Sequence, residues 1–435
     1  MQSVHAAVGL PQRLIEALAV AAIVLVPLAV WPTAFESFRL PKEHLSRAIG
    51  FAMLPLLVWI PKAKYLRFFK RSRPFALTGG VAAVWTLVRA ISAGHHAALD
   101  TIIAIVVAAL LLVAFMILAD LRTARVVYLM FISTAINVAV LTAQRFGASP
   151  IHVELNDGTH PATALLGNTN DIGMTLLFPA LAGLAATFHE SKPRWRVLAA
   201  TATMIAVAGL LLSYSVTALV AFCCAATVLL IMRFDTVRSR SLAALAVLTI
   251  GLTVMTATPS FRNRIEAWIL TASAGRWNEL MSNRVVPFVA AFEMFTDSPV
   301  MGVGPGGFRA LYFDYKLRVD ERYEFLAEDM ATWSLGRVIN FGETHNEYLQ
   351  VMAELGAPGL LLLIGAIVAL GNQSLRHYDK TGNTERYAHH LALPMAVGFG
   401  VLSLAQFPLR LAAPRLFVLL IVAVCFICIP EQEPR

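Results

Sequence analysis

The sequence predicts an all-α polytopic membrane protein with about 12 transmembrane helices and one large, partly helical periplasmic loop. The first observation is composition: 58% of the 435 residues are hydrophobic, 14% are charged, and the mean hydropathy is +0.68. Soluble domains carry about 25% charged residues. The second observation is that apolar runs of roughly 18 residues or more recur along the chain. Only helices and closed barrels span a bilayer, and these runs are too long and too uniformly apolar for barrel strands.

The apolar segments fall into two groups, nine before a long polar stretch and three after it. Each is close to the length that crosses the hydrocarbon core as a helix, roughly 20 residues. The seventh and eighth are separated by so few residues that we expect a tight helical hairpin. The predicted spans are 13–31, 46–61, 76–94, 99–119, 124–144, 169–188, 195–213, 215–232, 241–258, 348–370, 389–407 and 412–430.

Basic residues gather in alternate connections between the spans. The densest cluster, KAKYLRFFKRSR at Lys62–Arg73, has six basic residues and no acidic one. Because positive charge marks cytoplasmic loops, we expect this loop and both chain termini in the cytoplasm. In a bacterium the opposite, active face is periplasmic and the membrane is the inner membrane. The net charge of +8 is explained by this orientation, and nucleic acid is not an expected partner.

The chain is expected to form one integrated membrane domain in three parts. Residues 1–258 hold the first nine spans, residues 259–346 form the periplasmic loop with amphipathic helices, and residues 347–435 hold the last three spans. Loops of this length inside a compact protein are usually functional. No internal repeat is visible, which disfavours the transporter folds built from inverted repeats.

The four cysteines lie in apolar segments. Cys425 and Cys428 have the CxxC spacing of redox or metal sites, but their apolar neighbours favour packing inside a helix, as for Cys223 and Cys224. We therefore expect packing, and no metal or redox site, at the cysteines.

His345 stands in the stretch ETHNEYLQ, just before the tenth span. A helix start offers free N–H groups and a positive dipole, which disfavours the imidazolium and leaves a neutral ring able to accept a proton. Histidine is also the commonest general base near neutral pH. The alternative is an interfacial histidine that caps the helix or bonds Glu347. Glu354, at membrane depth, needs a partner, for which Asn346 or the helix backbone is expected.

Cations gather on the outer side from several separate loops. The planar guanidinium suits phosphate oxygens, and two or more at a membrane surface could hold a pyrophosphate. The alternatives are solvated charge, lipid headgroup contact and, for Lys42, snorkelling to the interface. Convergence of at least three loops favours an anionic ligand. These cations are Lys42, Arg262, Arg264, Arg276, Arg284, Arg410 and Arg415.

Two other polar stretches face outward. GNTNDIG, at 167–173, opens the sixth span with Asn168, Asn170 and Asp171, of which Asn170 or Asp171 suits a helix N-cap. GVGPGG, at 302–307, lacks the strand context of a dinucleotide-binding loop and the Lys-Ser/Thr of a P-loop. Its glycines are expected to let the backbone turn sharply against neighbouring helices.

Together these motifs resemble the superfamily of O-antigen ligases and Wzy-type O-antigen polymerases. The resemblance is carried by FRLPK, GNTND, SNRVVPFVAAFEMFTDSPVMGVGPGGF, THNEYLQVMAELGAPG and QFPLR. The plan of twelve spans with one large periplasmic loop matches over nearly the whole chain. Arg284 and the DxPxxGxG motif, followed by HNxYL, form a combination that is fairly specific for this superfamily, whereas none of these motifs alone would be.

The resemblance implies a metal-independent, inverting glycan transfer from undecaprenyl pyrophosphate to an acceptor hydroxyl at the membrane surface. A ligase uses lipid A-core as acceptor, and a polymerase uses another lipid-linked glycan. By the matching motifs, His345 would activate or orient the acceptor and Arg284 would bind the pyrophosphate. Arg264, Lys42 and Arg410 are the further candidates for the donor pyrophosphate, and the supporting polar residues are Asn168, Asn170, Asn346 and Glu354.

The sequence departs from the family at one position. An arginine that the family often carries between two middle helices falls here near Val216, where LLLSYSVTALVAF has none. Arg264, Arg276, Arg410 or Lys42 could substitute for it. O-antigen ligation is the favoured function and polymerisation is the alternative within the class. A transporter or flippase of an anionic or lipid-linked solute is the alternative from another class.

Overall fold

The computed structural model describes residues 9–34, 36–94, 96–122, 124–148, 162–323, 341–376 and 386–427. Within these residues the chain is built from helices and contains no strand, which confirms the all-α prediction. Nine of the described helices are long and apolar enough to cross a membrane. The protein is therefore a polytopic helical membrane protein.

A helix stands at the position of each predicted span. Three of these helices fall short of spanning length or apolarity: α2 is polar in its first half, and the apolar parts of α17 and α18 are short. The helices are α1 (Leu10–Leu25), α2 (Arg39–Leu57), α4 (Arg73–Ala93), α5 (His96–Arg122), α6 (Met130–Arg145), α7 (Thr169–His189), α8 (Pro193–Ser213), α9 (Val216–Arg233), α10 (Val237–Ala257), α16 (Glu347–Arg376), α17 (Arg386–Leu402) and α18 (Ala412–Ile427).

Two connections differ from the sequence prediction. The basic cluster expected as a loop forms a helix, α3 (Lys62–Arg71), and two of its cations are held by Asp120 on α5, from Lys64 at 3.2 Å and from Arg67 at 2.7 Å. Helix α2 begins at Arg39, so Lys42 lies inside the helix and not before it. Both differences arise because polar residues extend helices beyond their apolar runs, which alone guided the prediction.

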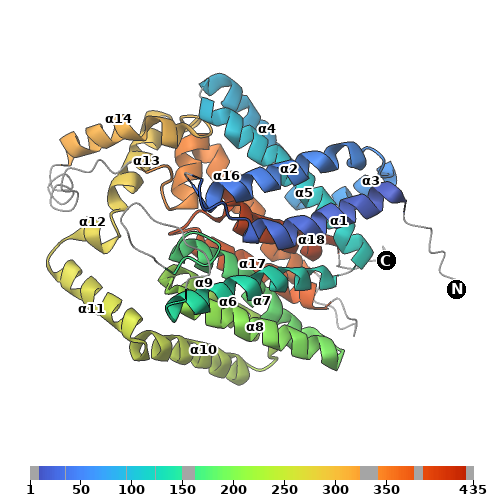
Figure 1. Ribbon diagram of the computed structural model, residues 1–435. Helices are drawn as coiled ribbons and strands as arrows, with labels where there is room; N and C mark the ends of the chain where they lie inside the picture. Colours follow the sequence, from blue (N-terminus) through green and yellow to red (C-terminus); the bar gives the residue numbers. More distant parts are fainter. Residues whose placement is uncertain are drawn as a thin grey trace, which may run out of the picture.

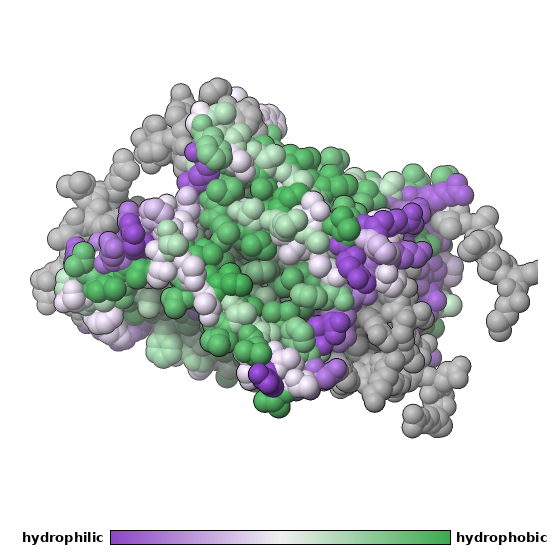
Figure 2. All heavy atoms as spheres, turned by 90° about the horizontal axis from the view of Figure 1, so that it is seen from below, coloured by the Kyte–Doolittle hydropathy of each residue, from purple (hydrophilic) through white to green (hydrophobic). Residues whose placement is uncertain are grey.

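The long stretch between α10 and α16 contains short helices. They are α11 (Pro259–Ser273), α12 (Trp277–Leu280), α13 (Val285–Asp297) and α14 (Gly307–Arg322). Figure 1 shows them gathered at one end of the helix bundle, with α3 at the other. Figure 2 shows hydrophobic side chains over the middle of one face and hydrophilic ones toward both ends, as expected of a chain that crosses a bilayer.

Helix α7 lies at the centre of the core, with almost every residue buried from Ile172 to Ala186. Glycines let its neighbours approach: a Cβ on Gly173 would lie 2.6 Å from Ser215 Cβ, and one on Gly183 would lie 2.4 Å from Thr203 Oγ1. Helices α8 and α9 are joined as tightly as predicted, but α8 packs mainly on α7, and α9 mainly on α17. The connection between α8 and α9 is therefore a sharp turn between two helices that pack on different neighbouring helices.

The GVGPGG stretch has the structural role predicted for its glycines. The N–H of Gly304 donates to the carbonyl of Glu354 at 2.9 Å, and Gly302 has a φ of +63°. A Cβ on Gly302 would lie 2.4 Å from that Glu354 carbonyl, so only glycine fits. The stretch thereby fixes the long loop to the start of α16, where Gly356 at φ +68° breaks the helix.

Candidate functional site

A polar cavity of about 530 Å³ lies where four distant parts of the chain meet. The segment around α2, the start of α7, the residues before α16 and the start of α18 all contribute to it. Its lining includes the side chains of Glu36, Arg39, Lys42, Asn168, Asp171, Glu343, His345 and Phe407. A cavity of this size falls in the range of ligand sites, roughly 300–1,000 Å³.

His345 lines this cavity in a fixed orientation. Its Nδ1 lies 3.1 Å from the Glu343 carbonyl, which can only accept, so Nδ1 carries the proton and Nε2 is left as an acceptor. The ring stands edge-on to Phe341 and Phe407, with centroids 5.6 and 4.9 Å away. Burial, together with the positive charge of Arg284, lowers the pKa of His345 to about 4. The imidazole is therefore neutral at pH 7 and can accept a proton.

Arg284, at the start of α13, lies beside the histidine. Its Nη1 donates to the carbonyl of Ala405 at 2.9 Å, and the Asn346 side chain donates to the adjacent carbonyl of Leu404, also at 2.9 Å. Burial lowers the pKa of Arg284. No carboxylate of the described residues pairs with it. The structure thus brings the predicted His345, Arg284 and Asn346 together and leaves most of the guanidinium's donors available.

The protonation of His345 can be tested directly. We expect NMR titration of the full-length protein, labelled at histidine Cε1, to show this ring titrating near pH 4, well below the ordinary value of about 6.5. Removing the neighbouring charge with Arg284→Gln should raise the pKa, because a positive charge disfavours the imidazolium. His345→Gln identifies the resonance. A pKa of 6.5 that Arg284→Gln does not change would contradict the environment described.

Arg39 and Glu343 join two cavity segments that are far apart in sequence. Arg39 Nη1 lies 3.0 Å from Glu343 Oε1, and the Arg39 guanidinium lies 5.7 Å from the centre of the Phe407 ring. Glu343 is the residue whose carbonyl orients His345. Neither side chain was predicted as a site residue from the sequence, although Arg39 belongs to FRLPK and Glu343 to ETHN.

Lys42 reaches the cavity but its ammonium group is fully occupied. Its Nζ donates to three carbonyls, those of Ala29 at 2.7 Å, Phe38 at 3.0 Å and Leu165 at 2.6 Å. An ammonium has three protons, so none is left over. Lys42 therefore ties α2 to the segments that precede α2 and α7.

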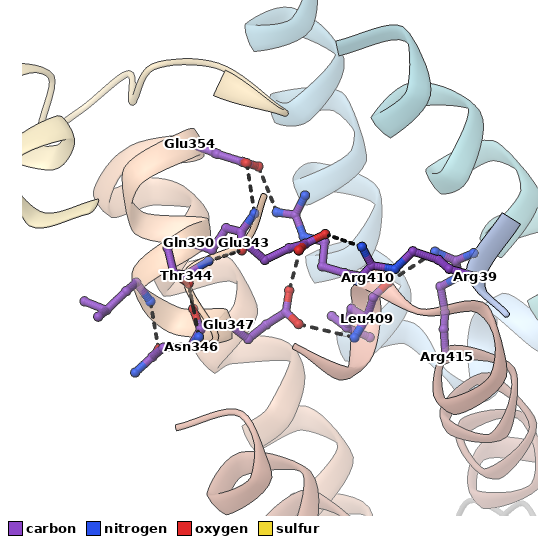
Figure 3. A network of polar contacts seen from close by, with 11 residues as sticks. Arg39, Glu343, Thr344, Asn346, Glu347, Gln350, Glu354, Leu409, Arg410 and Arg415 are labelled. Atoms are coloured by element: carbon purple, nitrogen blue, oxygen red, sulfur yellow. Dashed lines mark hydrogen bonds and ion pairs between the residues drawn. The ribbon is translucent and has the colours of Figure 1, made fainter. Parts of the chain in front are cut away.

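Arg410 lies in a network of buried charges (Figure 3). Its Nη2 lies 2.8 Å from Glu354 and its Nε lies 3.6 Å from Glu347, and both carboxylates are only 2% exposed. Gln350 donates to Glu354 as well, at 3.2 Å. Glu354 thus bonds Arg410 and Gln350, and not the Asn346 or helix backbone expected from sequence. The network locks the start of α16 to the turn before α18.

The asparagines of GNTND hold the beginning of α7. Asn168 is the N-cap, and its side chain accepts from the N–H groups of Asn170 and Asp171, both at 2.9 Å. The sequence suggested Asn170 or Asp171 as the N-cap, but the N-cap is Asn168. Asn170 instead accepts from Ser215 Oγ at 3.1 Å, and so joins α7 to the turn between α8 and α9. Of the two asparagines, only Asn168 lines the cavity.

Two arginines converge on the turn near Val216, where the sequence lacks one. Arg264, on α11, donates to the carbonyl of Tyr214 at 3.0 Å. Arg145, at the end of α6, donates to the carbonyl of Leu212 at 3.0 Å and lies 4.3 Å from the centre of the Tyr214 ring. Arg145 was not among the sequence candidates because its position beside this turn depends on helix packing.

Strained backbone marks the same region. Within the described part of the chain, five residues other than glycine have a positive φ. His345 itself has a φ of +59°, and Ser282 and Asn283 immediately precede Arg284. The carbonyl of Tyr214 accepts from Arg264, and Ala164 precedes Leu165, whose carbonyl accepts from Lys42. Such conformations cost on the order of 1–3 kcal/mol each and concentrate at functional sites. The five are Ala164, Tyr214, Ser282, Asn283 and His345.

Metal-binding side chains do not cluster in the ranges that the structure covers: no group of three His, Cys, Asp or Glu could hold an ion there. Cys428 of the CxxC pair lies outside those ranges.

Part of the chain is similar to a known protein family. Residues 199–364 match the sequence model of the O-antigen ligase family. The matched region includes Arg264, Arg284, His345, Asn346 and Glu354, and it confirms the resemblance for the motifs within it. The motifs FRLPK, GNTND and QFPLR lie outside this region. The curated proteins compared with the chain include no match.

Proposed function

Because residues 199–364 match the O-antigen ligase family, we propose that this protein transfers a glycan from undecaprenyl pyrophosphate to an acceptor hydroxyl at the periplasmic face of the bacterial inner membrane. The proposed acceptor is lipid A-core, which makes the reaction O-antigen ligation. One observation carries the proposal: a neutral histidine, His345, lines a polar cavity with the positive charge of Arg284 beside it.

The arrangement supports an acid–base mechanism at the acceptor. Nε2 of His345 accepts the proton of the acceptor hydroxyl, whose oxygen forms a bond to the anomeric carbon of the glycan. The bond from that carbon to the pyrophosphate oxygen breaks, its electron pair leaves with the pyrophosphate, and the configuration inverts. The pyrophosphate is already an activated leaving group, so the proposal includes no metal or cofactor.

The departing pyrophosphate needs a fixed cation, and we assign Arg284 to this role. Negative charge that develops on a leaving group is stabilised best by donors already in place. Arg284 has no carboxylate partner among the described residues, whereas Arg410 is paired with two glutamates and Lys42 is bonded to three carbonyls. Lys42 and Arg410 therefore hold the site together, and Arg264 is the second candidate for a phosphate contact.

The test is complementation of a strain that lacks the gene, read on a lipopolysaccharide gel. We expect the wild-type protein to restore a ladder on lipid A-core, and Arg284→Ala to reduce transfer by on the order of 10²–10³-fold, as for loss of a leaving-group or oxyanion contact. Arg318→Ala is the matched control, because Arg318 is an exposed arginine on α14 that pairs with Asp297. Protein levels are matched by blotting.

Other results would redirect the proposal. Single-repeat caps on lipid A-core in the deletion strain, lengthened by the wild-type protein, would identify a polymerase. Full activity of both Arg284→Ala and His345→Ala would refute the catalytic assignment and favour transport of an anionic or lipid-linked solute.

A further inference from the structure

The cavity beside His345 is lined by more acidic than basic side chains. Its lining includes three carboxylates, those of Glu36, Asp171 and Glu343, and two cations, Arg39 and Lys42. Both cations already hold oxygen partners: Arg39 pairs with Glu343, and Lys42 donates to three carbonyls. Neither Glu36 nor Asp171 forms an ion pair with any residue that the structure describes. A pyrophosphate that entered would therefore meet two further acidic side chains and, among the lining residues, no cation that lacks an oxygen partner.

The same lining suits a sugar. Carboxylate oxygens accept hydrogen bonds, so they complement hydroxyl groups. The cavity volume of about 530 Å³ leaves room for more than one sugar ring, and the rings of Phe38 and Phe407 supply apolar surface between the polar groups. His345 lies in the wall, so a hydroxyl held in the cavity is next to the proton acceptor.

The available cation lies outside the lining of this cavity. Arg284 does not line the cavity; it contacts the carbonyl of Ala405, next to the one that Asn346 contacts. It is nevertheless close enough for its charge to act on the imidazole. His345 therefore lines a cavity that contains three acidic side chains and also feels the charge of an arginine that has no acidic partner among the described residues.

We propose that this cavity receives the acceptor sugar, with Asp171 and Glu343 accepting hydrogen bonds from its hydroxyls, and that the donor phosphates bind outside it, on the Arg284 side of His345. This inference rests on the proposed function and assigns substrates to the two sides of the site. It also explains why Lys42 is bonded to backbone carbonyls and Arg39 to Glu343. The two cations hold the cavity wall in place, and the remaining oxygen atoms of the wall can accept hydrogen bonds from the acceptor sugar.

The experiment measures transfer by the purified full-length protein in nanodiscs, with the two substrate concentrations varied separately. The donor is an undecaprenyl-pyrophosphate-linked O-antigen repeat, and the acceptor is lipopolysaccharide that lacks O-antigen. We expect Asp171→Asn, which replaces one acceptor oxygen by an amide donor, to raise the acceptor KM about tenfold and to leave the donor KM within about twofold. Arg284→Gln should do the reverse. Asp314→Asn, an exposed carboxylate on α14, is the control.

Two failures can be told apart. If the wild-type protein transfers glycan neither to this acceptor nor to a second lipid-linked glycan, the proposed function is wrong. If it transfers glycan but Asp171→Asn raises the donor KM and leaves the acceptor KM unchanged, the proposed function stands and the assignment of the cavity is overturned. Should Asp171→Asn not fold, Glu36→Gln takes its place, since Glu36 precedes α2 and caps no helix of the core.

Discussion

Replacement of His345 by alanine is expected to reduce glycan transfer by about 10²–10⁴-fold, the usual contribution of a positioned general base. The reason is geometric: Nδ1 is committed to the Glu343 carbonyl, so Nε2 is the nitrogen that can take the proton of the acceptor. The low pKa of about 4 keeps it unprotonated over the physiological range. Rates are measured with saturating donor and acceptor, so that the change reports the chemical step.

The control for this variant is His44→Ala, because His44 is an exposed histidine on α2 that does not line the cavity. His345→Gln distinguishes proton transfer from positioning, since glutamine can accept a hydrogen bond but cannot take up a proton at neutral pH. A His345→Gln enzyme with wild-type rates would mean that the residue only orients the acceptor. Wild-type rates in His345→Ala would remove it from the site.

Replacement of Arg410 by alanine is expected to lower the free energy of unfolding by about 3–5 kcal/mol, the usual cost of removing one partner from a buried ion pair. Glu347 and Glu354 are each 2% exposed and would be left without their cation. Thermal unfolding in detergent measures the change, and Arg318→Ala, which removes an exposed arginine, should stay within about 1 kcal/mol of the wild type.

The origin of the lost stability can be checked by neutralising the two unpaired carboxylates. In the Arg410→Ala background, the Glu347→Gln and Glu354→Gln changes together should recover a large part of the lost stability, because a neutral amide is less costly to bury than an unpaired carboxylate. If the triple variant is as unstable as Arg410→Ala alone, the loss comes from packing of the arginine side chain and not from charge.

Much of the fold followed from local sequence signals. Apolar runs of spanning length placed a helix at every predicted span, and the glycines of 302–307 took the turning role expected of them. His345 could be chosen because its motif and its position at a helix start coincided, and Arg284 because of its motif. The structure brings Arg284 close enough for its charge to lower the pKa of His345.

The partners of the polar residues could not be predicted in the same way. Arg39 and Glu343 are separated by 304 positions, and nothing in either local stretch says that they meet. Arg145 comes to the turn near Val216 only because α6 packs on α8. Lys42 was a plausible phosphate ligand in sequence, but the carbonyl of Leu165 that helps to hold it lies 123 residues further on. Such contacts depend on tertiary packing, which hydropathy does not encode.

The network around Arg410 also bears on how the protein is made. Glu347 and Glu354 leave the ribosome more than fifty residues before the arginine that neutralises them. An unpaired carboxylate within a bilayer costs several kcal/mol, so the start of α16 has no stable place in the membrane until Arg410 follows. Residues 407–414 also complete the cavity wall. The proposed catalytic site is therefore completed late in biogenesis, and a chain that ends before Phe407 lacks part of the cavity wall.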